Sequence, residues 1–70
     1  MVFNIGDIIE LTQDVLFCDK GLICQVVELE EGNYGWVKIL ESHKCKDFTG
    51  ERKHANLTLF KLVRKVGLYV

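Results

Sequence analysis

Residues 22–40 of the chain, LICQVVELEEGNYGWVKIL, contain two branched apolar segments on either side of four turn-forming residues. In the second segment Val37 and Ile39 share one face and Trp36 lies on the other, which is the alternation of a strand with one buried face. The connection, residues 30–33, includes a glycine able to adopt a positive φ, which is typical of a tight hairpin. This stretch therefore predicts two antiparallel strands joined by a hairpin, and with them an all-β fold.

Short apolar runs separated by turn signals continue on both sides of this hairpin, without any proline. Such a pattern indicates a small β protein. A single helical turn is expected near residues 55–58, and a tail over residues 64–70. Residues 57–66 also have spacing compatible with a helix, so a C-terminal helix is the alternative to the last strand. The expected strands cover residues 7–11, 22–29, 34–40, 51–54 and 59–63.

The length of 70 residues leaves room for one hydrophobic core. With 49% hydrophobic and 27% charged residues the composition is that of a folded chain, so disorder is not expected. A chain this short buries roughly 60% of the surface that its unfolded form exposes, which makes an enzyme pocket of about 300 Å³ difficult to build. We therefore expect a single domain over residues 1–70 that is not an enzyme and uses no cofactor.

Charge is divided unevenly along the chain, although the net charge is only −1. Residues 1–35 carry seven acidic residues and one basic residue, whereas residues 36–70 carry eight basic and three acidic residues. One interpretation is a dipolar surface that orients a partner. The alternative is that paired strands bring the two halves together and neutralise the charges.

No apolar run approaches the roughly 18 residues of a membrane span, and the N-terminus lacks a basic region followed by a cleavage site. We therefore expect a cytoplasmic protein without a membrane partner, in which the three cysteines stay reduced. A disulfide from Cys24 to Cys18 or to Cys45 is the alternative. The cysteines lack the C-x2-C spacing of a zinc knuckle, so no metal is expected and Cys24 is assigned to the core.

Turn residues followed by branched apolar residues recur four times along the chain. The four groups are Gly6-Asp7 with Ile9 and Leu11, Lys20-Gly21 with Val26 and Leu29, Gly35-Trp36-Val37 with Ile39, and His54 with Leu59-Phe60-Lys61-Leu62-Val63. Over residues 4–63 this order resembles SH3-like small β-barrels, including the KOW-type barrels, and the resemblance implies a single five-stranded barrel. Such barrels occur in ribosomal and transcription proteins, in accessory subunits and in short phage proteins. The KOW motif of nucleic-acid-binding barrels usually has a second glycine where this chain has Cys24, which argues against carrying RNA binding over.

Trp36 is the strongest candidate for contact with a protein partner. If Val37 and Ile39 face the interior, Trp36 faces outward, and an exposed tryptophan commonly anchors a partner. The alternative is that the segment 41–50 or the C-terminal tail covers this side chain. The residues expected to bind the partner are Trp36, Tyr34, Phe17 and Lys38.

A second candidate surface combines basic side chains with one aromatic ring, which suits a nucleic-acid backbone and its bases. Its residues are Lys44, Lys46, Phe48, Arg52 and Lys53. Glu41, Asp47 and Glu51 lie in the same stretch, so a solvated loop is the competing interpretation.

These observations predict a small non-enzymatic interaction module or accessory protein that docks on a larger protein, with a phage origin suggested by the resemblance alone. The alternative is an SH3-like, KOW-type barrel that binds nucleic acid through its basic second half. The oligomeric state is left open by the sequence.

Overall fold

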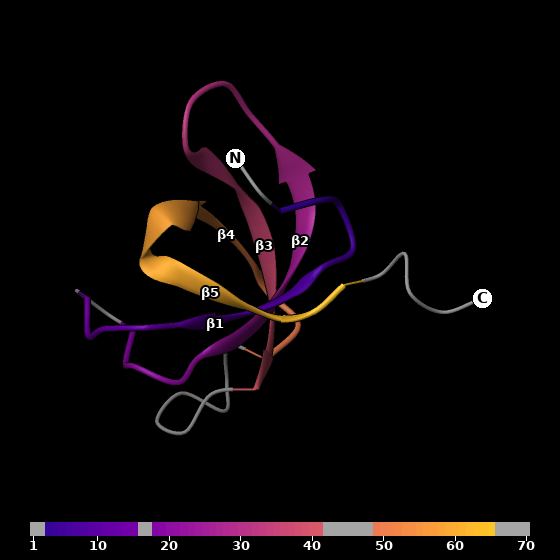
Figure 1. Ribbon diagram of the computed structural model, residues 1–70. Helices are drawn as coiled ribbons and strands as arrows, with labels where there is room; N and C mark the ends of the chain where they lie inside the picture. Colours follow the sequence, from indigo (N-terminus) through magenta and orange to yellow (C-terminus); the bar gives the residue numbers. More distant parts are fainter. Residues whose placement is uncertain (1–2, 16–17, 42–48, 66–70) are drawn as a thin grey trace.

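Five strands and one short helical turn make up the computed structural model, which describes residues 3–15, 18–41 and 49–65. The strands form one antiparallel sheet in the order β4-β3-β2-β1-β5 (Figure 1). Within these ranges no helix is long and apolar enough to cross a membrane. The elements are β1 (Ile8–Leu11), β2 (Ile23–Leu29), β3 (Tyr34–Glu41), β4 (Arg52–Asn56), η2 (Leu57–Leu59) and β5 (Phe60–Arg64).

The predicted all-β class and the five strands are confirmed. The last apolar segment is a strand, so the alternative of a C-terminal helix is wrong for the described residues. The helical turn is the 3-10 turn η2, where the Asn56 side chain accepts a hydrogen bond from the Thr58 N–H. The expected tail begins at the end of β5, and residues 66–70 lie outside the described residues.

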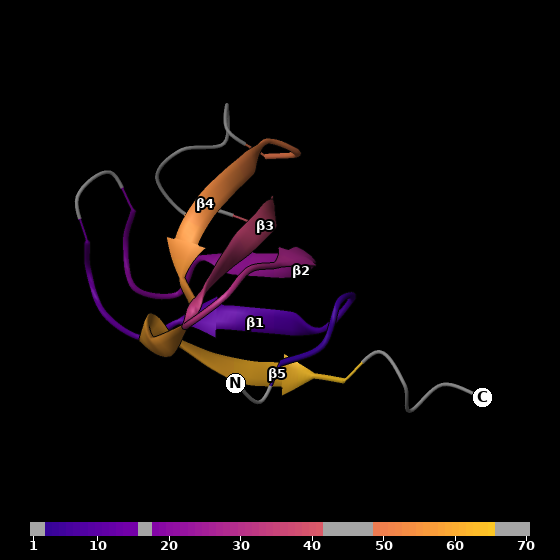
Figure 2. The ribbon, with the colours of Figure 1, turned by 90° about the horizontal axis from the view of Figure 1, so that it is seen from above.

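The sheet is twisted, and within the described residues it is not closed. Strands β4 and β5 are its two ends, and η2 leads directly from one to the other. In Figure 2 the two strands lie on opposite sides of the sheet, with β1, β2 and β3 between them. The expected strand count is therefore present, whereas no ladder between β4 and β5 completes a barrel in the described part of the chain.

The β2–β3 hairpin contains a register shift that decides which side chains share a face. Val26 lies opposite Val37, but Glu28 lies opposite Trp36, so Val27 is an extra residue in β2. An extra residue of this kind is a β-bulge, and it increases the local twist. The bulge places Glu28 and Trp36 on the outer face of the sheet.

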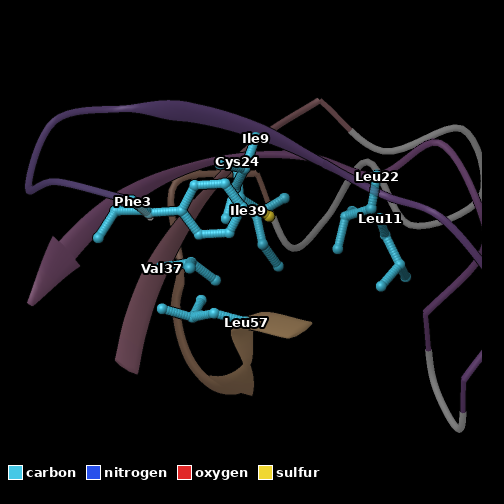
Figure 3. Packing of buried hydrophobic residues seen from close by; sticks show 9 residues of the cluster. Phe3, Ile9, Leu11, Leu22, Cys24, Val37, Ile39 and Leu57 are labelled. Carbon is cyan, nitrogen blue, oxygen red and sulfur yellow. The ribbon is translucent and has the colours of Figure 1, made fainter. Parts of the chain in front are cut away.

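The inner face of the sheet packs a single cluster of buried side chains (Figure 3). Val37 and Ile39 point into it, as the alternation predicts. Leu57 comes from η2 rather than from a strand, and the N–H of Leu57 donates to the Asn33 carbonyl at 2.7 Å. The members of the cluster are Phe3, Ile9, Leu11, Leu22, Cys24, Val26, Val37, Ile39 and Leu57.

Asp7 is fully buried and organises the turn before β1. Its carboxylate accepts a hydrogen bond from the Asn4 N–H at 2.8 Å, and its own N–H donates to the Asn4 carbonyl at 3.0 Å. Its carbonyl accepts from the Val26 N–H at 2.9 Å, which ties the turn to β2. A buried carboxylate is tolerated when it is paired or hydrogen-bonded, and the hydrogen bond from the Asn4 N–H supplies one such partner.

Cys24 is a core residue, and both Cys24 and Cys18 are free thiols. Burial raises the pKa of the Cys24 thiol to about 12, with a further contribution from the nearby Cys18 and a smaller opposing one from Lys53.

The reactive form of cysteine is the thiolate. Cys24 is therefore expected to resist iodoacetamide at pH 8 in the folded protein, while the half-buried Cys18 reacts faster; peptide mass spectrometry gives both rates. Equal reaction rates of Cys18 and Cys24 in the folded protein would contradict this prediction. As a control, the two cysteines are expected to react at equal rates when the protein is unfolded in guanidinium.

Candidate functional site

The outer face of β2, β3 and β4 carries a cluster of aromatic and charged side chains, which we call the Trp36 face. Trp36 sits at its centre, opposite Glu28 on one neighbouring strand and opposite His54 on the other. Its members are Glu28, Glu30, Tyr34, Trp36, Arg52 and His54.

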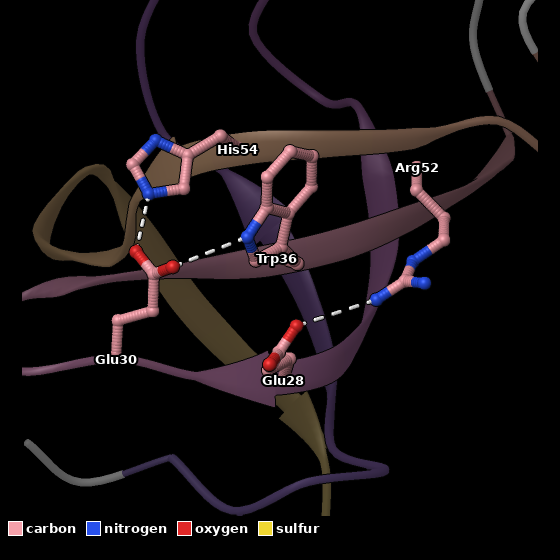
Figure 4. A network of polar contacts seen from close by, with 5 residues as sticks. All are labelled: Glu28, Glu30, Trp36, Arg52 and His54. Atoms are coloured by element: carbon pink, nitrogen blue, oxygen red, sulfur yellow. Dashed lines mark hydrogen bonds and ion pairs between the residues drawn. The ribbon is translucent and has the colours of Figure 1, made fainter.

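Glu30 fixes two of the rings at once (Figure 4). The Trp36 Nε1–H donates to Glu30 Oε2 at 3.3 Å, and His54 Nε2 lies 2.6 Å from Glu30 Oε1. An ionised carboxylate only accepts, so this histidine nitrogen is the donor. The hydrogen bond from His54, followed by that from Trp36, lowers the pKa of the Glu30 carboxyl. The contribution of these bonds to stability is therefore present above the ordinary Glu pKa and is lost as the pH falls through the lowered value.

The rings form a continuous strip across β3 and β4. Tyr34 stacks on His54 with 5.5 Å between ring centroids and an angle of 8° between the planes. Trp36 packs against the same imidazole at 5.2 Å, tilted by 56°. Tyr34 remains 48% exposed. The strip therefore leaves part of its aromatic surface exposed to solvent.

Arg52 holds the other side of the indole. Its Cζ atom lies 5.9 Å from the centroid of the Trp36 ring, within the range of a cation–π contact. One guanidinium nitrogen lies 3.6 Å from Glu28 Oε2, and both side chains of this ion pair are 57% exposed. An ion pair this exposed contributes little to stability, so both charges remain available to a partner.

The residues predicted to bind a protein partner are partly brought together. Trp36 points outward, as predicted, and is half-buried. Tyr34 joins it through the shared contact with His54, and Lys38 is exposed further along β3, opposite Arg52. Phe17 lies outside the described residues. The sequence-based prediction did not include Glu28, Glu30 and His54 on this face.

The predicted nucleic-acid surface is only partly described. Arg52 belongs to the Trp36 face, where it pairs with Glu28. Lys53 is half-buried, and lines a groove on the inner side of β4. Lys44, Lys46 and Phe48 lie outside the described residues. The two described members therefore lie on different sides of β4.

That groove is a second feature of the molecule and has a volume of about 140 Å³. It opens between the inner side of β4, the start of β5 and the segment between β1 and β2. Its surface is mostly apolar, and the residues that line it are Leu11, Val15, Cys18, Leu22, Val37, Lys53, His54, Ala55, Asn56, Leu59 and Phe60. Among the described residues, no three His, Cys, Asp or Glu side chains come together as a metal site.

Comparison of the chain with protein-family models, with curated proteins and with solved structures finds no match. The fold and the two surfaces define a small all-β protein with an aromatic, charged sheet face and an adjoining apolar groove. The geometry of these two surfaces is therefore what indicates a function.

Proposed function

We propose that the protein is a small non-enzymatic interaction module with an SH3-like fold, which docks on a larger protein through the Trp36 face. The five antiparallel strands and the 3-10 turn before the last strand support the SH3-like assignment. The arrangement of the Trp36 face supports the docking role.

The observation that carries the proposal is the preorganised Trp36 ring. Tryptophan, tyrosine and arginine are the residues that most often dominate the energy of a protein interface. Here Trp36 is held by Glu30, His54 and Arg52 before any partner arrives. A side chain already ordered in the free protein loses little conformational entropy on binding, so more of its contact energy is available for affinity.

The charges on the same face favour a protein partner over a nucleic acid. Glu28 and Glu30 lie beside the rings and would repel phosphates. Arg52 and Glu28 together offer one charge of each sign, which suits the mixed charges of a protein surface. Binding of nucleic acid is therefore not expected, and the experiment below tests for it directly.

Replacement of Trp36 by alanine tests the docking role. We expect Trp36→Ala to lower the amount of the captured partner by tenfold or more in an affinity capture quantified by mass spectrometry, because loss of a central anchor costs about 2 kcal/mol or more. The matched control is Val63→Ala, which removes an exposed apolar side chain from β5, two strands beyond β2 in the sheet. Circular dichroism establishes that both variants are folded.

Two results contradict the proposal. One is unchanged capture by folded Trp36→Ala. The other is binding of a fluorescent single-stranded oligonucleotide that weakens steeply with added salt, since such a salt dependence reports phosphate contacts. The expected result is that no oligonucleotide binds at low salt.

A further inference from the structure

We propose that the free edge of β4, together with the apolar groove beside it, binds an extended acidic segment of the partner protein as a sixth strand. This inference rests on the proposed function, because it assumes a protein partner. It adds a second contact site and the chemistry of the segment that fits there.

Within the described residues, no strand pairs with β4 on the side away from β3. The N–H of Ile39 donates to the Glu51 carbonyl and the N–H of Leu57 donates to the Asn33 carbonyl, so odd-numbered residues of this ladder bond to β3. In an antiparallel ladder the alternate residues direct both backbone groups to the other side. The N–H and C=O groups of Arg52 and His54 therefore point outward, and no described strand pairs with this edge.

The groove lies where the inward side chains of an added strand would point. Lys53 and Ala55 line it from β4, while Leu59 and Phe60 line it from the start of β5. A cavity of about 150 Å³ with apolar walls holds a group the size of benzene. The groove, with a volume of about 140 Å³, accordingly accepts one large apolar side chain such as phenylalanine or leucine.

Charge selects an acidic segment. Arg52 and Lys53 are adjacent on β4, one on each face, and Lys53 lines the groove. Opposite charges on neighbouring strands stabilise their pairing. Glu28 offsets Arg52 on the outer face, but the exposed Lys38 lies opposite Arg52 there and leaves this end of β4 with an excess of positive charge. The segment therefore has an apolar residue directed into the groove and an acidic residue on the outer face near Arg52 and Lys38.

Strand β5, at the other end of the sheet, does not combine a free edge with an apolar groove in the described part of the chain. Strand β5 also has a free edge among the described residues, and its Lys61 is paired with Glu10 at 3.8 Å much as Arg52 is paired with Glu28, so the groove is what distinguishes the two edges. Leu62 and Val63 are exposed there, and neither lines the groove. Recognition by strand addition uses backbone hydrogen bonds for affinity and side-chain pockets for specificity, and β4 supplies both.

Amide hydrogen exchange with a synthetic peptide tests the proposal. The probe is an acetylated and amidated heptapeptide of alternating valine and glutamate with phenylalanine at one central valine position, added at about 1 mM, a concentration that detects even weak binding. We expect exchange at the Arg52 and His54 N–H groups to slow by tenfold or more, because these donors become hydrogen-bonded. Exchange at Lys53 and Ala55 is expected to stay as it is, since these residues already pair with β3.

The control peptide has the same sequence with N-methyl groups at alternate residues on the edge that would face β4, which removes the donors needed for strand addition. It is expected to give no protection. Unchanged exchange at Arg52 and His54 with the first peptide overturns the proposal, as does equal protection by the methylated peptide.

A charge reversal separates this site from the Trp36 face. Lys53→Glu is expected to weaken binding of the acidic peptide by about tenfold, whereas Lys61→Glu on β5 is the matched control with little effect. Equal weakening by both variants means that only overall charge matters and overturns the edge site. If the peptide protects β4 but Trp36→Ala leaves partner capture intact, the Trp36 face is rejected as the docking site while the edge site stands. If the peptide gives no protection but Trp36→Ala abolishes partner capture, only the edge site is rejected.

Discussion

Leu57→Ala is expected to lower the free energy of unfolding by about 2–5 kcal/mol, the usual cost of removing a buried leucine side chain. Leu57 is fully buried, although it belongs to the short turn η2 rather than to a strand. Its side chain packs below Val37 at the bottom of the core in Figure 3, and one of its methyl carbons approaches Gly35. Since the backbone of η2 is anchored to Asn33, the turn cannot easily move inward to fill the cavity.

The total stability of a chain of this length is only roughly 4–10 kcal/mol, so the loss is a large part of the whole. Chemical denaturation followed by circular dichroism measures it. The matched control is Leu62→Ala on β5, where the same atoms are removed from a side chain that is 40% exposed, and a loss below about 1 kcal/mol is expected there. Similar losses for the two variants would show that η2 does not close the core.

Gly35→Ala is expected to destabilise the protein by about 2–3 kcal/mol, near the upper end of the usual cost of overpacking. A Cβ atom at residue 35 would lie 2.6 Å from the backbone oxygen of Glu28 and 3.1 Å from Leu57 Cδ1. The first contact is with the backbone of the paired strand, which cannot rotate away as a side chain does. The added methyl group therefore has to push β2 and β3 apart at the point where the bulge places Glu28 opposite Trp36.

The control for Gly35→Ala is Gly32→Ala in the β2–β3 turn. Gly32 has a φ of 74°, and a Cβ atom there would meet nothing within 4 Å. Alanine at this position should cost roughly 1 kcal/mol from backbone strain alone. Denaturant unfolding of both variants gives the ranking, and a larger loss for Gly32→Ala contradicts the steric explanation.

The strand pattern could be predicted because burial imposes it residue by residue. The alternation around Val37 and Ile39 required one buried face, and the turn glycine between the two apolar segments required a hairpin. The side on which Trp36 lies followed from the same alternation. The C-terminal segment was ambiguous by sequence, because Leu59, Leu62 and Val63 satisfy helical spacing as well as strand spacing. Pairing with β1 selected the strand.

The neighbours of Trp36 could not be predicted, because they depend on the bulge in β2. With an uninterrupted register from Val26 and Val37, Val27 would lie opposite Trp36 and Glu28 would turn to the inner face. A one-residue shift exchanges the two faces of a strand, and the sequence contains no local signal that fixes it here. The positions of Glu28 and Glu30 beside Trp36 are a consequence of that shift, whereas His54 is placed there by the pairing of β4 with β3.

The outward position of Trp36 and the arrangement of its neighbours are thus set in different ways. Alternating burial is a local property of each strand, so the amino-acid pattern alone is enough to predict an all-β chain with Trp36 on an outward face. The contacts of Glu30, His54 and Arg52 with the ring arise only on folding, as does the edge of β4 beside the apolar groove, with which no described strand pairs. These features depend on strand register and on the incomplete closure of the sheet, which are set by packing between residues far apart in the chain.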